Sequence, residues 1–274
     1  MKRSLAIVLT FTLLMSLALS PVFAQEKNTL VIGEAPATQF AYTTNNIGGL
    51  YGSVVFSALF KSTLDLQDIK PDLATGYTVS DDQLTFTLEL RDDVYWHDGE
   101  KFTAEDVEFN LGLALKAGVI NGVYVAAFSS IEGADKFMGG TSDHISGITI
   151  DGNTVTIQMA KPYGAFLNVL ANWVLLPKHL LEDADPLTVP TASFWQWPIG
   201  TGPFKVSEVE WGNYAILERS DAYYGQAPKI DQIKMSTMND PIVATQAGEI
   251  DYFNTNNAPS TASSMPASTL GLSL

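Results

Sequence analysis

The sequence has no cysteine among its 274 residues. This absence excludes disulfide bonds, thiolate metal sites, a cysteine nucleophile and a lipid anchor attached to an N-terminal cysteine. The fold must therefore be stabilised mainly by hydrophobic burial, and 46% of the residues are hydrophobic. A chain of this length and composition is expected to form one large domain or two modest ones.

Positive charge is also scarce. Lysine and arginine total 15 against 30 acidic residues, for a net charge of -15. Lys2 and Arg3 lie in the N-terminal leader, so loss of these two charges would leave the remaining chain at -17. Such a surface repels phosphate backbones and anionic membranes, so nucleic acid is not expected as a partner. Net charge does not identify the ligand of a single cleft.

Histidine occurs only three times, at His97, His144 and His179, and none lies near a G-x-S-x-G motif. There is no Walker motif and no dinucleotide fingerprint. His97 and Asp98 could begin a metal site, but the same pair is typical of a turn. The paired carboxylates of the chain lie in predicted turns or helix ends, where solvation and capping explain them. We therefore expect a protein that is not an enzyme and has no cofactor or metal.

Long hydrophobic runs are absent beyond the N-terminus. Met1-Lys2-Arg3 is followed by an apolar run from Leu5 to Leu19 and by small residues that end at Ala24. This pattern predicts a signal peptide over residues 1–24, cleaved after Ala24. The alternative, a membrane anchor, is disfavoured because the run is shorter than the ~20 residues needed to span a bilayer. The protein is expected to be periplasmic or secreted, without a lipid anchor.

The stretch from Pro71 to Lys116 carries the clearest local signals. Residues 84–90 alternate between apolar and polar, which predicts a strand buried on one face. Asp81-Asp82-Gln83 predicts the turn before it, and His97-Asp98-Gly99 predicts a second turn. Thr103 stands where the N-cap of a helix ending at Lys116 is expected.

Strands and helices are both predicted elsewhere, which makes the chain α/β. Hairpins are expected over 148–157 and 204–219, with turns at Asp151-Gly152 and Gly212-Asn213. Further strands are expected at 29–32 and 230–235. Helical spacing predicts a buried helix over 47–60, and Asp240-Pro241 predicts a helix running to Gly248. The last 21 residues, 254–274, carry no charge, and little packed structure is expected there.

Three motifs together resemble the family 5 extracellular solute-binding proteins of ABC importers. The first is Trp96-x-Asp98-Gly99 followed by F-T-A-x-D-V at 102–107, directly after the strand 84–90. The second is G-T-G-P-F-K-V at 200–206, and the third is A-G-E-I-D at 247–251. The resemblance covers roughly Thr29 to Phe253.

The resemblance implies a periplasmic-binding-protein-like fold of type II. It implies a first lobe made of residues 25–45 and 163–253, with a small inserted domain at 46–162. Relatives continue with another large lobe, so this chain is expected to be incomplete, with the second lobe missing and a poorly ordered tail at 254–274.

Aromatic residues and glycines are the candidate ligand-binding residues. Phe40 and Tyr42 lie in a loop after the first strand, where α/β folds place ligands. Trp195 and Trp197 lie immediately before the glycine segment, in a loop that the resemblance implies lines the cleft, and Gly200 and Thr201 belong to that segment. The alternatives stay open: Tyr42 could face solvent, and both tryptophans could cover the hairpin below them.

Two functions remain in view. The resemblance implies a monomeric substrate-binding component that captures peptides or similar small solutes and delivers them to the membrane permease of an ABC transporter. The alternative is a truncated relative or interaction fragment with no independent ligand capture.

Overall fold

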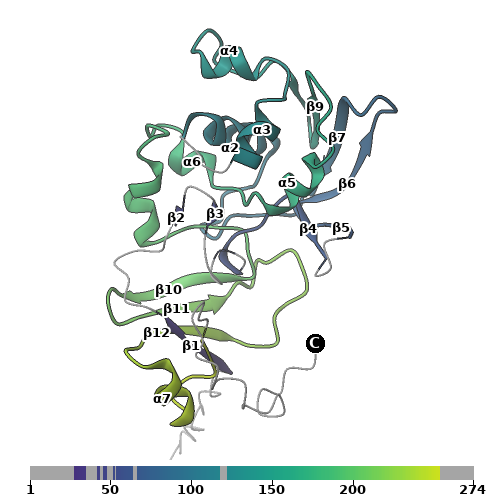
Figure 1. Cartoon of the computed structure of the whole chain (residues 1–274). Helices are drawn as coiled ribbons and strands as arrows, with labels where there is room; N and C mark the ends of the chain where they lie inside the picture. The colour runs from purple at the N-terminus through teal and green to yellow at the C-terminus, as the bar shows by residue number, and fades with distance from the viewer. Residues whose placement is uncertain are drawn as a thin grey trace, which may run out of the picture.

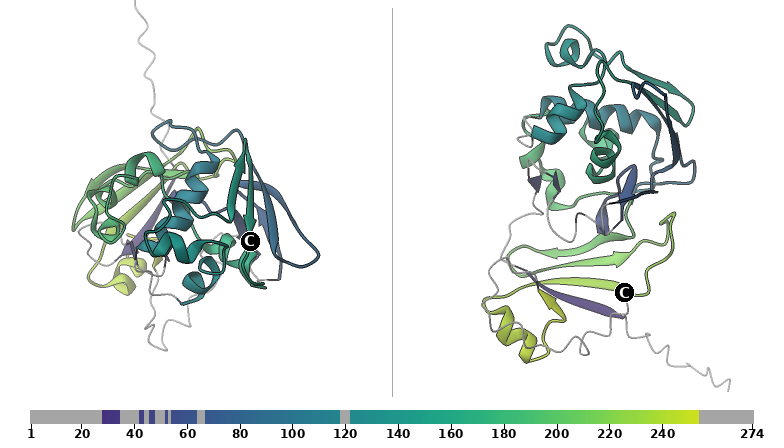
Figure 2. Two further views of the ribbon diagram at one scale, coloured as in Figure 1. Left: turned by 90° about the horizontal axis from the view of Figure 1, so that it is seen from above. Right: turned by 45° about the vertical axis from the view of Figure 1, so that its right-hand side comes forward.

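The computed structural model describes residues 28–34, 42–43, 46–47, 52, 54–63, 67–117 and 122–253. The predicted signal peptide, Phe40 and the neutral tail lie outside these residues. Figure 1 shows the described chain in two parts, a five-stranded sheet and a helix-covered four-stranded sheet. The view from the side in Figure 2 shows the same two parts, one above the other.

The five-stranded sheet joins the start of the chain to its last third. Its strands, in spatial order, are β10 (Phe204–Glu210), β11 (Tyr214–Arg219), β12 (Gln232–Thr237), β1 (Thr29–Glu34) and β13 (Tyr252–Phe253). β11 runs antiparallel to both β10 and β12, whereas β1 runs parallel to both β12 and β13. The hairpin predicted over 204–219 is confirmed, and Gly212 takes a φ of 83° in its turn.

A short helix, α7 (Pro241–Gln246), lies between β12 and β13 in the chain (Figure 1). Asp240 caps it, because its Oδ1 accepts hydrogen bonds from the N–H groups of Ile242 and Val243, both at 3.1 Å. The predicted start of this helix is therefore confirmed. Ile250, just beyond it, packs so closely on β1 that a Cβ at Gly33 would lie 2.8 Å from its Cδ1.

The four-stranded sheet is antiparallel and contains both predicted strands of the 148–157 hairpin. Its strands, in spatial order, are β6 (Ala74–Val79), β7 (Thr85–Leu90), β9 (Thr154–Gln158) and β8 (Ile148–Asp151). Phe86, Leu88 and Leu90 are buried while the residues between them are not, as their alternation predicts. Gly152 has a φ of 58° in the turn between β8 and β9.

Five helices in the described part of the chain accompany this sheet. They are α2 (Ala104–Lys116), α3 (Gly122–Phe128), α4 (Ala134–Met138), α5 (Phe166–Asn172) and α6 (Lys178–Leu181). The ring of Phe166 in α5 lies 4.9 Å from that of Phe86, and it also meets Phe128 of α3 edge-on. α5 and α6 thus pack on the four-stranded sheet and its helices, although the predicted domain boundary precedes them at residue 163. That boundary stays a prediction.

Helix α2 begins as its sequence predicts. Gly99 has a φ of 92° in the turn before it, and the helix runs from Ala104 to Lys116 after Thr103. The Asp106 carboxylate accepts a hydrogen bond from the Thr103 N–H at 2.9 Å and another from the Lys178 N–H at 3.0 Å. Asp106 therefore joins the start of α2 to the start of α6.

We expect Thr103→Ala to lower the free energy of unfolding by about 1 kcal/mol, because a threonine N-cap is replaced by a residue that cannot cap. Thermal and urea melts would measure the loss. An unchanged melting curve together with a loss of ligand binding would contradict this structural role for the motif.

The segment 47–60 is not the single helix that its spacing predicts. Among its described residues, only Gly52, Val54 and Val55 are helical. Its ends lie in strands instead: β3 (Asn46–Ile47) pairs with β2 (Tyr42–Thr43), and β4 (Phe60–Ser62) pairs with β5 (Ile69–Pro71). Ala58 also forms a bridge with Val174. These tertiary pairings outweigh the helical spacing of the apolar residues.

Candidate functional site

The predicted glycine segment lies at the junction of the two sheets. Gly200 and Gly202 pass against the backbone of Val54 and Val55, and the Gly202 N–H donates to the Val55 carbonyl at 2.8 Å. A Cβ at Gly200 would lie 1.9 Å from the Val55 carbonyl oxygen, and one at Gly202 would lie 2.4 Å from that of Val54. Both positions therefore require glycine for a close approach of two backbones.

His97 fixes this segment from its other side. Its backbone N–H donates to the Gly200 carbonyl at 2.9 Å, and its Nδ1 accepts from the Gly200 N–H at 3.2 Å. Because Nδ1 is the acceptor, Nε2 carries the proton and donates to the Gly202 carbonyl at 2.9 Å. Burial lowers the pKa of His97 to about 4, so the ring is neutral at physiological pH.

Both ring nitrogens of His97 thus form hydrogen bonds with backbone groups. This agrees with the structural role in a turn, rather than a role as a metal ligand. His179, by contrast, places its Nε2 2.8 Å from Asp98 Oδ2 at the same turn. Within the described ranges, no three His, Asp or Glu side chains are grouped so that they could bind a metal ion.

The two tryptophans of the aromatic loop have different surroundings. The loop contains two short 3-10 helices, η1 (Val189–Thr191) and η2 (Ser193–Gln196). Trp195 is 0% exposed, and its indole N–H donates to the Val189 carbonyl at 2.7 Å. Its ring packs on Phe56 and Phe194, at 6.0 and 4.9 Å. Burial favours the packing alternative for Trp195, whereas Trp197 is 47% exposed.

The remaining predicted residues are buried or lie outside the described part. Gly200 is buried, and Thr201 is 2% exposed. The Thr201 Oγ1 has no hydrogen-bond partner among the described residues. Tyr42 belongs to strand β2, but its side chain lies outside the description, as does the whole of Phe40. Of the predicted residues with a described side chain, Trp197 alone presents an open surface, and a ligand-binding role for all six stays a prediction.

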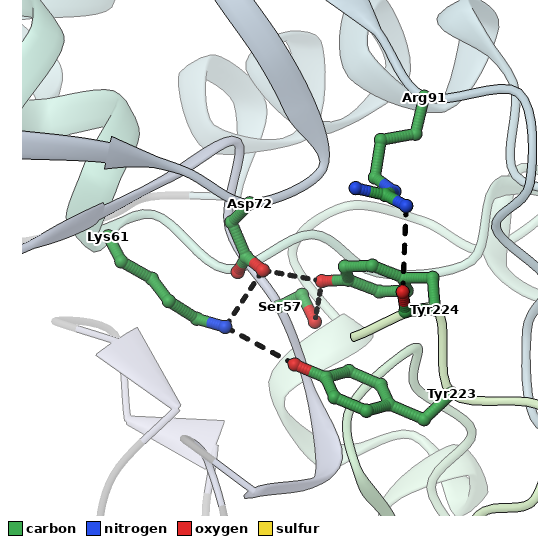
Figure 3. Close-up of polar contacts among 6 residues, drawn as sticks. All are labelled: Ser57, Lys61, Asp72, Arg91, Tyr223 and Tyr224. Carbon is green, nitrogen blue, oxygen red and sulfur yellow. Dashed lines mark hydrogen bonds and ion pairs between the residues drawn. The ribbon is translucent and has the colours of Figure 1, made fainter. Parts of the chain in front are cut away.

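A polar cluster that the sequence did not reveal lies at the same junction (Figure 3). At its centre is Asp72, whose side chain is 3% exposed. Its Oδ1 lies 2.8 Å from Lys61 Nζ and accepts a hydrogen bond from the Tyr224 hydroxyl at 2.6 Å. A phenol has one proton, so the Tyr224 oxygen in turn accepts from the Ser57 hydroxyl at 2.9 Å.

The cluster attaches the loop between β11 and β12 to the smaller sheet. Tyr223 and Tyr224 come from that loop, whereas Asp72 precedes β6 and Arg91 follows β7. The Arg91 guanidinium lies 5.0 Å from the centre of the Tyr224 ring. Burial and the Asp72 carboxylate both raise the pKa of Tyr224, so its hydroxyl keeps the proton that it donates. These residues come from separate segments, and no spacing in the sequence identifies them.

We expect Tyr224→Phe to destabilise the protein by about 1.5 kcal/mol, because it removes the donor to a buried carboxylate. Tyr223→Phe is the matched control. Among the described residues its hydroxyl hydrogen-bonds only to the half-exposed Lys61, at 3.4 Å, and we expect a loss below about 0.5 kcal/mol. Equal losses in urea melts would contradict the role assigned to Asp72.

The comparisons with known proteins agree with this architecture. The fold matches the structure of the oligopeptide-binding protein AppA of Bacillus subtilis in complex with a nonapeptide, with a TM-score of 0.67 and 25% identity over 83% of this chain and 44% of that one. It also matches NikZ of Campylobacter jejuni in complex with Ni(L-His), with a TM-score of 0.66 and 31% identity over 82% and 43% of the two chains. The fold is therefore a mixed α/β fold of the type II periplasmic binding proteins, matched over less than half of their length.

Sequence comparison identifies the family. The model of the bacterial extracellular solute-binding proteins, family 5, matches residues 68–268, and the chain belongs to that family. A putative ABC transporter peptide-binding protein of Brucella ovis is 33% identical over 191 residues, which are 68% of this chain and 33% of the relative. AppA is 28% identical over 228 residues, or 81% and 39% of the two chains. The chain thus spans a third to two fifths of the length of these curated relatives.

The family consists of solute-binding proteins, not enzymes, which confirms the predicted class. No helix in the described part of the chain is long and apolar enough to cross a membrane.

Proposed function

We propose that this chain is the substrate-binding component of an ABC importer, which captures peptides or similar small solutes outside the cytoplasmic membrane. Membership of the family supports the proposal. The observation that carries it within the structure is the exposed Trp197, three residues before the buried Gly200 at the sheet junction. An aromatic face on a fixed backbone can contact a peptide without ordering a long side chain.

The ligand class that we propose is inferred from the ligands bound to the related proteins. The structure of AppA contains a nonapeptide, and that of NikZ contains nickel with histidine. In this chain Trp197, with Phe40 and Tyr42, would form one wall of the site. Gly200, Thr201 and Trp195 would position that wall, since they are buried.

The proposal includes export and a partner. Residues 1–24 would be removed as a signal peptide, and the monomer would deliver its ligand to the membrane permease of the transporter. Residues 25–45 and 163–253 would form the first lobe, with 46–162 as the inserted domain and 254–274 as a loosely packed tail.

Calorimetric titration of the chain from Gln25 with a mixture of short peptides tests this function, with tryptophan fluorescence followed in parallel. We expect saturable binding and a fluorescence change that is lost in Trp197→Phe. Tyr252→Phe, an exposed aromatic on β13, is the matched control and should leave both signals unchanged.

A folded chain that releases no saturable heat with any peptide would favour the alternative, a truncated relative or interaction fragment without independent ligand capture. The coverage of the relatives, 33% to 39%, is the observation that keeps this alternative in view. A good pocket buries about 70 to 90% of a small ligand, and one wall alone buries less.

A further inference from the structure

A cavity lies away from the sheet junction, on the helical side of the smaller sheet. It has a volume of about 470 Å³, and all its lining residues fall between Glu105 and Pro186, on α2, α4, α6 and the loops beside them. It shares no residue with the glycine segment, the aromatic loop or the Asp72 cluster. Pockets that bind small molecules commonly have volumes of this size.

The inner wall of the cavity is apolar. Phe109 and Leu113 of α2 line it together with Phe137 of α4 and Ile145. Gly112 contributes to this shape, because a Cβ there would lie 2.9 Å from Cζ of Phe137. The missing side chain lets the aromatic ring rest directly on the helix.

The rim of the cavity is acidic. Glu105, Glu108 and Asp143 line it, and none of them forms an ion pair with any described residue. The fourth carboxylate, Glu182, is paired with Lys178 at 3.3 Å. Lys116 also lines the cavity, so these three carboxylates and one lysine leave an excess of negative charge that favours a cation over an anion.

The cavity already accommodates one ammonium group on its aromatic wall. Lys116 Nζ lies 3.8 Å from the centre of the Phe137 ring, within the range of a cation–π contact. The ring face is thus accessible to a positive charge. Because this lysine extends from α2 on a flexible stem, it can move aside for another cation.

We propose that this cavity binds a small organic cation, an amine carried on an apolar or aromatic body. The apolar wall would take the body, and Glu108 with Asp143 would attract the ammonium group. A strongly hydrated metal ion does not fit this site, because half of the lining could not replace its water ligands. The site is separate from the one proposed for transported solutes, so each can fail without the other.

Three probes of similar shape test the proposal on the full chain by calorimetry: 2-phenylethylamine, 2-phenylethanol and 3-phenylpropionate. We expect the amine to bind saturably, the alcohol about tenfold more weakly and the acid not at all. Amide chemical shifts in an NMR titration should move around Leu113 and Ile145. Equal binding of the amine and the alcohol, or shifts that map to residues 195–202 instead, would overturn the proposal.

A double variant isolates the charge. Glu108→Gln with Asp143→Asn should weaken binding of the amine about fivefold and leave that of the alcohol unchanged. The matched control is Asp221→Asn with Glu249→Gln, which removes two exposed carboxylates outside the cavity. The proposal is wrong if both double variants bind the amine as the wild type does.

Discussion

Gly200→Ala is expected to destabilise the protein by about 3 kcal/mol or more. The added Cβ would lie 1.9 Å from the carbonyl oxygen of Val55, and both groups belong to backbones that cannot swing aside like a flexible side chain. Overpacking of a well-ordered site costs about 1 to 3 kcal/mol. Here the displacement of the Gly200 backbone would also strain its hydrogen bonds with His97.

Gly164→Ala is the matched control. Gly164 is exposed, has no atom within 4 Å of an added Cβ and does not take a positive φ. Urea melts of both variants should give a loss for Gly200→Ala alone. Similar melts for the two variants would show that the junction is looser than its geometry indicates.

The second large effect concerns pH. The pKa of His97 is about 4 in the folded protein and near 6.5 in an unfolded chain, so the unfolded state binds more protons between these values. Stability from this residue is complete above pH 6.5 and falls as the pH decreases towards 4. A difference of this size in pKa corresponds to about 3 kcal/mol.

Carboxylates titrate in the lower part of the same pH range and also change the stability. The contribution of His97 is therefore measured as the difference in stability between the wild type and a variant that lacks this histidine. His97→Asn cannot take up the proton, and its deficit relative to wild type should be largest above pH 6.5 and shrink by about 3 kcal/mol at pH 4. His144→Asn, a change at an exposed histidine, should follow the wild type at every pH. A deficit for His97→Asn that does not vary with pH would rule out a neutral His97 ring that is hydrogen-bonded at both nitrogens.

Local signals in the sequence predicted the local structure. The hairpins at 148–157 and 204–219 and the starts of α2 and α7 depend on alternation, turn residues and caps that lie within a few positions of one another. The same reasoning predicted a helix over 47–60, which was wrong because the ends of this segment pair with residues outside it.

The junction was predicted only in part, and the reason is distance along the chain. The glycines of 200–202 suggested a close approach, but not that Val55 is what they approach. Trp195 and Trp197 are two positions apart in one loop, and only the 3-10 turn of η2 determines that one is buried and the other exposed. The residues of the Asp72 cluster come from separate segments, so no sequence pattern predicts that they lie together.

The position of β1 sets an order for folding. This strand lies between β12 and β13, and its partner Gln232 is 203 residues away. The meander of β10, β11 and β12 needs only short loop closures and can form by itself, whereas β1 completes its pairing only when the chain through Phe253 is in place. The first strand of the described chain is therefore among the last to pair, and until then its backbone N–H and C=O groups are free to pair with another strand.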